Sequence, residues 1–273
     1  MEKLLREMHA WMADYMRSFY TEDEEVQQAI RMKEVHTGRV TSIAVELAKH
    51  LHLSAHDVQL AEIMGLFHDV GRFRQFTLYR TFNDAVSEDH AALGLKVLDE
   101  LPFLARLVPE DEALVRFSIL NHNKKVIAPT EDARQLFFAR LLRDADKLDI
   151  FRVLRPFLAP PDGTGVSPDF LEKFIAGEQV DYTKIRTMDD RKLVRLMWVY
   201  DVNFSWTLQR VKERGYIEDI IAHLPENPRM ALGIERLHAY VEKKCAEEDA
   251  APGAVREPVA TRTPTRPPAT LSP

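Results

Sequence analysis

Apolar residues recur every three or four positions along most of the chain, which places them on one face of an α-helix. One such stripe runs through residues 40–51 and another through residues 60–67. Ser87 and Thr130 each precede a further stripe. We interpret both as helix N-caps, because their side chains can accept hydrogen bonds from free backbone amides. No segment shows the alternation of a half-buried strand, so the pattern predicts an all-α protein.

The second half of the chain continues this pattern, with helices predicted over about 188–214 and 227–247. The run Pro160-Pro161-Asp162-Gly163 predicts a loop between the two halves, because proline and glycine interrupt helices. Residues 250–273 contain six prolines, which remove backbone donors and break helices. We therefore expect one helical domain over residues 1–249, followed by a disordered Pro-rich tail.

Composition narrows the class of protein. The chain has 273 residues, of which 45% are hydrophobic and 29% charged, as is typical of a globular protein. Its single cysteine, Cys245, excludes a disulfide framework within the chain and a cysteine-rich zinc site. The formal net charge of -6 argues against non-specific nucleic-acid binding as the main task, although a local basic pocket is compatible with it.

No segment indicates targeting or a membrane span. Charged residues interrupt the N-terminus too early for a secretory signal, and no run of about 18 apolar residues occurs. We therefore expect no membrane contact and a location in the cytoplasm, with which a lone thiol agrees. The helices after about residue 165 could form either a cap or a dimer surface, so a homo-oligomer stays open.

Four of the ten histidines and two aspartates stand in an order that suggests a metal site. They fall on, or at the ends of, separate predicted helices: His36, His68 with Asp69, His90, His122 and Asp146. A metal site in a helical bundle takes its ligands from several helices, and imidazole nitrogens and carboxylate oxygens are suitable donors. We interpret the other six histidines as structural residues.

His68 and Asp69 are adjacent in the sequence, so they can bind the same metal ion only from a suitable place on a helix. Neighbours on a helix point about 100° apart, so both side chains reach one site most easily at a helix end, which Gly71 would supply. Two more aspartates leave the downstream part of the site open. Asp144 could serve as the last ligand instead, and Asp149 could either orient a ligand or form a surface ion pair.

Three segments carry a family resemblance. His36 lies in Val35-His36-Thr37-Gly38-Arg39-Val40, the doublet in Leu66-Phe67-His68-Asp69-Val70-Gly71-Arg72, and the last ligand in Asp144-Ala145-Asp146-Lys147-Leu148-Asp149. This ordered set, spread over roughly residues 30–155, resembles the HD-domain superfamily of metal-dependent phosphohydrolases. The resemblance implies an HD-domain helical bundle, with additional C-terminal helices over about 165–249. It also implies one metal ion, held by His36, His68, Asp69 and Asp146. Asp146 is preferred over Asp144 because an Ala-Asp-basic-Leu context is the family's.

Superfamily members with two-metal sites have further histidines between the doublet and the last aspartate. By that analogy Asp69 bridges two ions, and His90 and His122 hold the second. The resemblance implies two divalent transition-metal ions, either Fe, Mn or Co, with Mg, Ni or Zn as alternatives. The Gly-Tyr-Pro motif of cyclic-dinucleotide-degrading relatives does not occur in the sequence, which disfavours that substrate.

Charge suggests a mechanism for such a site. Two divalent ions acidify a water between them, and the resulting hydroxide attacks phosphorus while the ions neutralise phosphate oxygens. No protein nucleophile is then required. We expect Asp69 and Arg72 to take part in catalysis, because Arg72 stands where the family commonly has a basic residue near phosphate. Lys147 is a further candidate.

Residues 72–83 interleave arginines with aromatic side chains. Guanidinium groups match phosphate and aromatic rings stack on bases, so this composition suits an anionic substrate that carries a ring. We expect substrate binding by Arg72, Arg74, Arg80 and Lys124. Alternatively, the aromatic residues pack on the core and the arginines are solvated.

These observations favour metal-dependent hydrolysis of a small phosphoester, either a phosphomonoester or a nucleotide-like compound. Two alternatives stay open. Some HD-type proteins with this ligand order are diiron oxygenases, which would act here on a small anionic substrate. The other alternative is a non-catalytic domain that senses a nucleotide, although an intact ligand set argues against it.

Overall fold

Every regular element that the computed structural model describes is a helix, which confirms the all-α prediction. The structure describes residues 1–178 and 180–250. The predicted disordered tail, apart from Ala250, therefore lies outside the described residues. Within the described residues, no helix combines the length and the apolar character needed to cross a membrane.

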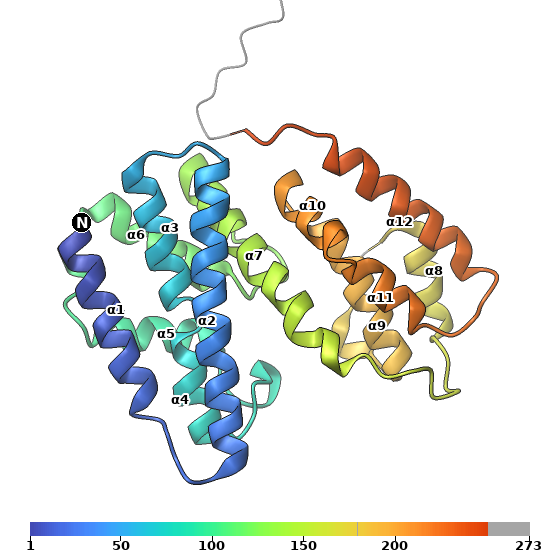
Figure 1. The fold of residues 1–273 in the computed structure, drawn as a ribbon, viewed down its shortest axis with the longest axis horizontal. Coiled ribbons are helices and arrows are strands. Elements are labelled where there is room, and N and C mark those ends of the chain that lie inside the picture. The colour runs from blue at the N-terminus through green and yellow to red at the C-terminus, as the bar shows by residue number, and fades with distance from the viewer. Residues whose placement is uncertain (179, 251–273) are drawn as a thin grey trace, which may run out of the picture.

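The first half of the chain forms a bundle of α-helices (Figure 1). Its elements are α1 (Glu2–Arg17), α2 (Glu24–His50), α3 (Ala55–Phe67), α4 (Val70–Tyr79), the 3₁₀ turn η1 (Asp84–Val86), α5 (His90–Asp99), the 3₁₀ turn η2 (Leu104–Arg106), α6 (Pro109–Asn121) and α7 (Ala133–Leu154). Helix α2 contacts α3, α4 and α7, so the helices that carry the predicted ligands are neighbours in space.

The second half forms a smaller helical group on the other side of α7 (Figure 1). Its elements are η3 (Arg155–Phe157), α8 (Pro168–Ala176), η4 (Tyr182–Lys184), α9 (Met188–Met197), η5 (Trp198–Asp201), α10 (Ser205–Glu213), α11 (Tyr216–Ala222) and α12 (Met230–Cys245). The predicted loop at 160–163 is indeed non-helical. Helix α7 packs against α2 and α6 in the first bundle and against α10 in the second group, so one helix joins the two halves.

Two glycines allow helices near the doublet to approach each other closely. A Cβ on Gly65 in α3 would lie 2.7 Å from Thr41 Cα in α2. A Cβ on Gly71 in α4 would lie 2.2 Å from the carbonyl oxygen of His90 in α5. Only glycine fits such a backbone approach. Gly71 therefore serves packing, and the prediction that it supplies a helix end is wrong, because it is the second residue of α4.

Two predicted N-caps lie two residues too early. Helix α5 begins after Asp89 and α7 begins after Asp132, and the side chain of each aspartate accepts hydrogen bonds from backbone amides of its helix. Ser87 and Thr130 precede these caps and lie outside the helices. Their hydroxyl groups are engaged elsewhere, since Ser87 Oγ donates to the carbonyl oxygen of Asn83 at 2.8 Å and Thr130 Oγ1 donates to Gln135 Oε1 at 2.9 Å.

The single helix predicted over 188–214 is interrupted. The structure divides it into α9, η5 and α10, and the chain leaves the helical conformation at residues 202–204. The buried carboxylate of Asp144 in α7 accepts hydrogen bonds from the backbone amides of Asn203 and Phe204, each at 2.9 Å. A contact with a distant helix therefore holds this break, and such a contact leaves no trace in the local pattern.

Candidate metal centre

The structure brings the six predicted ligands to one point inside the first bundle. They come from α2 (His36), the turn between α3 and α4 (His68 and Asp69), the first residue of α5 (His90), the residue after α6 (His122) and α7 (Asp146). The four histidines and Asp69 are at most 5% exposed. A doublet in the turn between two helices presents both side chains to the same point, as the sequence analysis expects.

Asp69 lies between two pairs of histidines. Its Oδ2 is 3.5 Å from His36 Nε2 and 3.6 Å from His68 Nε2. Its Oδ1 is 3.3 Å from His90 Nε2 and 3.7 Å from His122 Nε2. Each carboxylate oxygen therefore faces a different pair, which is the arrangement of a carboxylate that can bridge two ions.

Asp146 completes the first pair. Its Oδ1 lies 3.0 Å from His36 Nε2 and 3.8 Å from His68 Nε2. Asp144, the alternative ligand, is fully buried and binds the backbone amides of residues 203 and 204 instead. Of these two aspartates, Asp146 is the one that faces the histidines.

Backbone carbonyls orient two of the histidine rings. His68 Nδ1 lies 2.8 Å from the carbonyl oxygen of Gly65, and His122 Nδ1 lies 2.7 Å from that of Ile119. A carbonyl oxygen can only accept, so both Nδ1 atoms carry the hydrogen and donate it. This hydrogen bond directs the Nε2 atom of each ring towards the centre, where its lone pair can bind an ion.

Carboxylates orient the other two rings. His36 Nδ1 donates to Asp149 Oδ2 at 2.6 Å, and His90 Nδ1 donates to Asp84 Oδ2 at 2.7 Å. Arg39 also donates to Asp149, through Nη2 at 3.1 Å. Asp149, whose role the sequence leaves open, thus stands behind His36, in the position from which carboxylates orient metal-binding histidines.

The Nε2 atoms of His90 and His122 lie only 3.0 Å apart. Because each ring donates its hydrogen from Nδ1, two lone pairs face each other at this distance and repel. Burial lowers the pKa of His90 to about 4, so the His90 ring brings no proton into this contact near neutral pH. A bound cation would relieve it. Imidazoles together with a carboxylate are also donors that transition metals prefer, so the residues present fit a metal ion.

The charges of the centre agree with this fit. Burial lowers the pKa of His68 to about 4, which keeps its ring neutral. Burial acts to raise the pKa of Asp69, but the charge of Lys33 beside it holds that pKa well below its usual value. Burial and Lys33 act to lower the pKa of His36, yet its hydrogen bonds with two aspartates outweigh them and raise it. The centre therefore offers lone pairs and negative charge, and below the raised pKa of His36 an ion would displace a proton from that ring.

Sequence reasoning missed two side chains that support the centre. Lys33 Nζ donates to Asp69 Oδ2 at 2.7 Å. Lys33 stands three residues before His36 on α2, and this spacing on one helix face could have revealed it. Asp84, which accepts from His90, has no such signal, because its place depends on how the segment after α4 folds.

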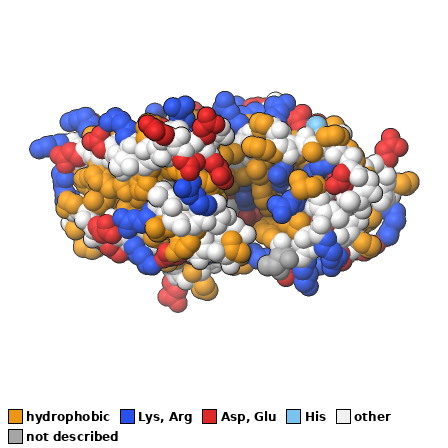
Figure 2. Space-filling model, turned by 90° about the horizontal axis from the view of Figure 1, so that it is seen from below, with side chains coloured by type: hydrophobic (Ala, Val, Ile, Leu, Met, Phe, Trp, Pro, Cys, Tyr) orange, Lys and Arg blue, Asp and Glu red, His pale blue; other side chains and the backbone are white. Residues whose placement is uncertain are grey.

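A cavity of about 840 Å³ opens onto the centre. Its walls come from α2, α4, α7 and residues 122–127 of the first bundle, and from η4 and η5 of the second group. Figure 2 shows the molecule hollowed between its two halves, with Lys and Arg side chains beside the hollow. Seven Lys or Arg residues and four Asp residues line the cavity, so its walls favour an anionic ligand.

Three of the predicted catalytic or substrate-binding cations, Arg72, Lys124 and Lys147, line this cavity. Arg72 pairs with Asp84 at 2.9 Å, and the two lysines also each contact an aspartate. Burial lowers the pKa of Lys147, although its aspartate partner opposes this. All three remain candidates for contact with an anionic substrate.

Arg74 and Arg80 do not line the cavity. Arg74 pairs with Glu100 at 3.0 Å, and Arg80 pairs with Asp23 at 2.8 Å. Phe73 is fully buried in the core, which turns the neighbouring Arg74 outwards. The expectation that these two arginines bind substrate is therefore corrected, and this segment follows the alternative in which aromatic residues pack on the core and the arginines are solvated.

The six remaining histidines lie outside the centre. Several pair with a single carboxylate, for example His9 with Glu62 at 2.8 Å and His56 with Asp111 at 2.6 Å. Single pairs of this kind indicate structural roles.

Comparison with known proteins gave one match. Residues 34–150 match the family model described as the HD domain, and this range contains all six side chains of the centre together with Asp149. Neither the comparison with curated proteins nor the comparison with solved structures gave a match.

Proposed function

We propose that this protein is a metal-dependent phosphohydrolase that cleaves a phosphoester with a metal-activated water, because residues 34–150 match the HD-domain family model. One observation carries the proposal, namely that the two oxygens of Asp69 face two different pairs of histidines. A carboxylate in this position suits two ions, and a two-ion centre suits hydrolysis of a phosphoester.

We assign the ligands as follows. His36, His68, Asp69 and Asp146 would hold one divalent transition-metal ion, and Asp69, His90 and His122 would hold a second. Fe, Mn and Co are the favoured ions. When bound, such ions acidify water and neutralise negative charge on phosphate oxygens.

The protein side chains around the centre would bind and orient the phosphate. Arg72 Nε lies 3.6 Å from Asp69 Oδ1, so a guanidinium group stands directly beside the bridging carboxylate. Guanidinium groups match the geometry of phosphate oxygens. Among the described residues that line the cavity there is no Ser, Thr or Cys, so an aliphatic hydroxyl or a thiol is not at hand to act as the nucleophile.

The test is phosphate release by the full chain, loaded with Mn²⁺, Fe²⁺ or Co²⁺, from a panel of phosphomonoesters and nucleotides. Asp69→Asn keeps the size of the side chain but removes the bridging charge. It should lower turnover by more than about 100-fold, because the loss of a residue that only supports a metal ligand already lowers activity by about 10- to 100-fold. Asp162→Asn, in an exposed loop, is the matched control and should leave turnover unchanged.

The alternatives give different results. If protein with two bound ion equivalents released no phosphate from any compound, hydrolysis would be contradicted. Oxygen uptake by the reduced iron form would then support a diiron oxygenase. Tight nucleotide binding without any turnover would support a sensing domain.

A further inference from the structure

The cavity at the metal centre has an aromatic end that the proposed chemistry does not use. Ile150 follows Asp146 by four residues on α7, so it lies on the same face, about 6 Å further along the helix. Trp198 and Tyr182 line the same cavity, and the Trp198 ring lies 6.1 Å from that of Phe151. The cavity that opens onto the centre thus has apolar and aromatic side chains in its wall, and Ile150 is the one that lies about one helical turn from Asp146.

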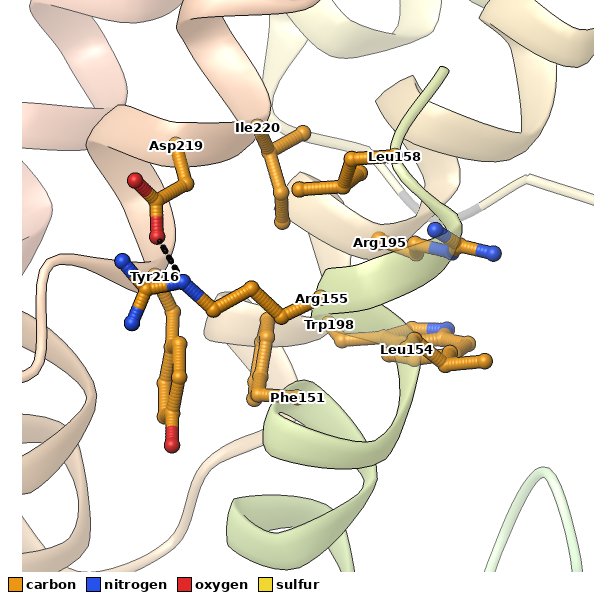
Figure 3. Close-up of a pocket in the computed structure, with 9 residues that line it drawn as sticks. All are labelled: Phe151, Leu154, Arg155, Leu158, Arg195, Trp198, Tyr216, Asp219 and Ile220. Carbon is orange, nitrogen blue, oxygen red and sulfur yellow. Dashed lines mark ion pairs between the residues drawn. The ribbon is translucent and has the colours of Figure 1, made fainter.

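Trp198 is held in place by its surroundings. Its ring meets that of Phe151 at an angle of 74°. Figure 3 shows Trp198 beside Leu154 at a second, much smaller cavity of about 10 Å³, which both residues line. A ring that is already fixed loses little conformational entropy when a ligand stacks on it.

Aromatic residues near the doublet are not available for this role. Phe73 is fully buried and Phe76 is 7% exposed. Phe82 is covered by Lys33 and Arg72, whose charged groups lie 5.3 and 5.7 Å from its ring centre. The Phe, Tyr and Trp side chains that line the cavity all come from the second group of helices.

We propose that Tyr182, Trp198 and Ile150, which line the same cavity, form a subsite for a planar ring, so that the substrate is an organic phosphate that carries a ring. This rests on the proposed function, because it places the phosphate at the metal centre. The cavity volume of about 840 Å³ suits a ligand of this size rather than inorganic phosphate. A nucleoside monophosphate has this chemistry.

The test compares esters with and without a ring on the metal-loaded full chain. Adenosine and uridine 5′-monophosphates carry a base, and ribose 5-phosphate is the same ester without it. We expect a higher kcat/KM for the nucleotides. Trp198→Leu should lower this value about 10- to 100-fold, as loss of one stacking contact does, and leave ribose 5-phosphate unaffected. Tyr79→Leu removes an exposed aromatic side chain outside the cavity and is the control.

A second variant guards against misfolding of the first. Tyr182→Leu removes a side chain that is 41% exposed, so it should leave the core intact and show the same selective loss. The ring subsite would be overturned if the wild-type chain hydrolysed nucleotides and ribose 5-phosphate equally well. It would also be overturned if both variants lost the same factor in kcat/KM on nucleotides and on ribose 5-phosphate. The proposed function would stand in either case.

If no ester were hydrolysed, the proposed function would fail separately, and calorimetry with adenosine 5′-monophosphate would decide on the subsite. Binding that Trp198→Leu weakens would support it. Absence of binding, or binding that the substitution leaves unchanged, would overturn it.

Discussion

Each histidine of the centre uses its two ring nitrogens differently. One nitrogen makes the hydrogen bond that fixes the ring, and the other faces the ion site. Where the fixing partner is a carboxylate, as Asp84 is for His90, its negative charge also makes the ring a stronger donor to a metal. Carboxylates behind the histidines should therefore affect metal affinity even though they bind no ion themselves.

Asp84→Asn tests this effect. The substitution keeps the size of the side chain but removes the charge behind His90, so the affinity of one of the two ion sites for Mn²⁺ should fall about 10- to 100-fold. Titration calorimetry measures both binding events. Asp14→Asn, on a side chain that is 74% exposed, is the control. If Asp84→Asn bound Mn²⁺ with the same affinities as the wild-type chain, the role given to this carboxylate would be contradicted.

The raised pKa of His36 predicts the pH dependence of metal binding. Burial acts to lower this pKa, but the hydrogen bonds with Asp146 and Asp149 raise it overall, so an ion that binds near neutral pH displaces a proton. Affinity should therefore fall as the pH falls, by about tenfold per pH unit for each proton released. Above the pKa of His36 the dependence should level off.

Calorimetry in buffers with different ionisation enthalpies counts the released protons. The exposed His238 provides the control, since His238→Ala should leave that count unchanged. Metal binding at pH 6 without any proton release would refute this assignment.

The meeting of these histidines and aspartates at one point could be predicted from sequence, because a candidate metal site restricts its residue types and their order along the chain is distinctive. The supporting residues could be predicted less well. Lys33 shares a helix face with His36 and could have been found, whereas Asp84 depends on the path of a loop. The directions of Arg74 and Arg80 depend on which face of α4 packs on the core, and composition does not show this.

At the scale of elements, the turn between α3 and α4 positions the centre. It presents His68 and Asp69 together, and the close packing of α4 on α5 at Gly71 brings His90 to the same place. The geometry of the centre therefore depends on a residue that has no side chain.

Gly71→Ala tests this dependence. The new Cβ would lie 2.2 Å from the backbone carbonyl oxygen of His90, so α4 and α5 must separate. We expect a loss of about 1–3 kcal/mol in the free energy of unfolding, measured with urea, and weaker binding of the second ion. Gly38→Ala in α2 is the control, because its Cβ would meet no atom within 4 Å. That variant should be as stable as the wild-type chain or slightly more stable. Equal behaviour of the two variants would contradict the packing role.

Helix type could be predicted from sequence, whereas several boundaries could not. The helical stripes follow local spacing, which the chain displays directly. The break at residues 202–204 depends on Asp144, more than 50 residues earlier in the chain, whose carboxylate accepts the backbone amides there at 2.9 Å. Asp89 rather than Ser87 caps α5, because the chain around Ser87 folds back so that its hydroxyl donates to the carbonyl oxygen of Asn83.

At the scale of the whole molecule, charge is distributed unevenly. The chain has a formal net charge of -6, yet seven Lys or Arg residues face four Asp residues in the cavity lining. Most of these cations pair with carboxylates. Arg140 makes no hydrogen bond or ion pair with the described part of the chain, so its charge is available to an anionic ligand.

Arg140→Gln should weaken binding of pyrophosphate to the metal-loaded chain about two- to fivefold, as an exposed charge contact does, and reduce its dependence on salt. Competition against a hydrolysed ester measures this change. Arg152→Gln, exposed on the same helix but outside the cavity lining, should have no effect. An equal effect of both variants would mean that general charge, rather than the cavity, attracts the anion.

The cavity itself could not be predicted from sequence. Its walls come from both halves of the molecule, and helical spacing within each half says nothing about how the halves meet. Tyr182 and Trp198 are far from the ligand motifs in the chain, so only the folded arrangement relates them to the centre.

The contact between Lys33 and Asp69 implies a sequence of assembly. Without metal, this ammonium group neutralises the carboxylate that two ions would share. Metal ions that bind should neutralise Asp69 in place of Lys33. The Lys33 side chain could then turn into the cavity and contact an anionic substrate. Metal binding would thus make the Lys33 ammonium group available to the substrate. An ester that entered the cavity before the metal would find Lys33 still paired with Asp69.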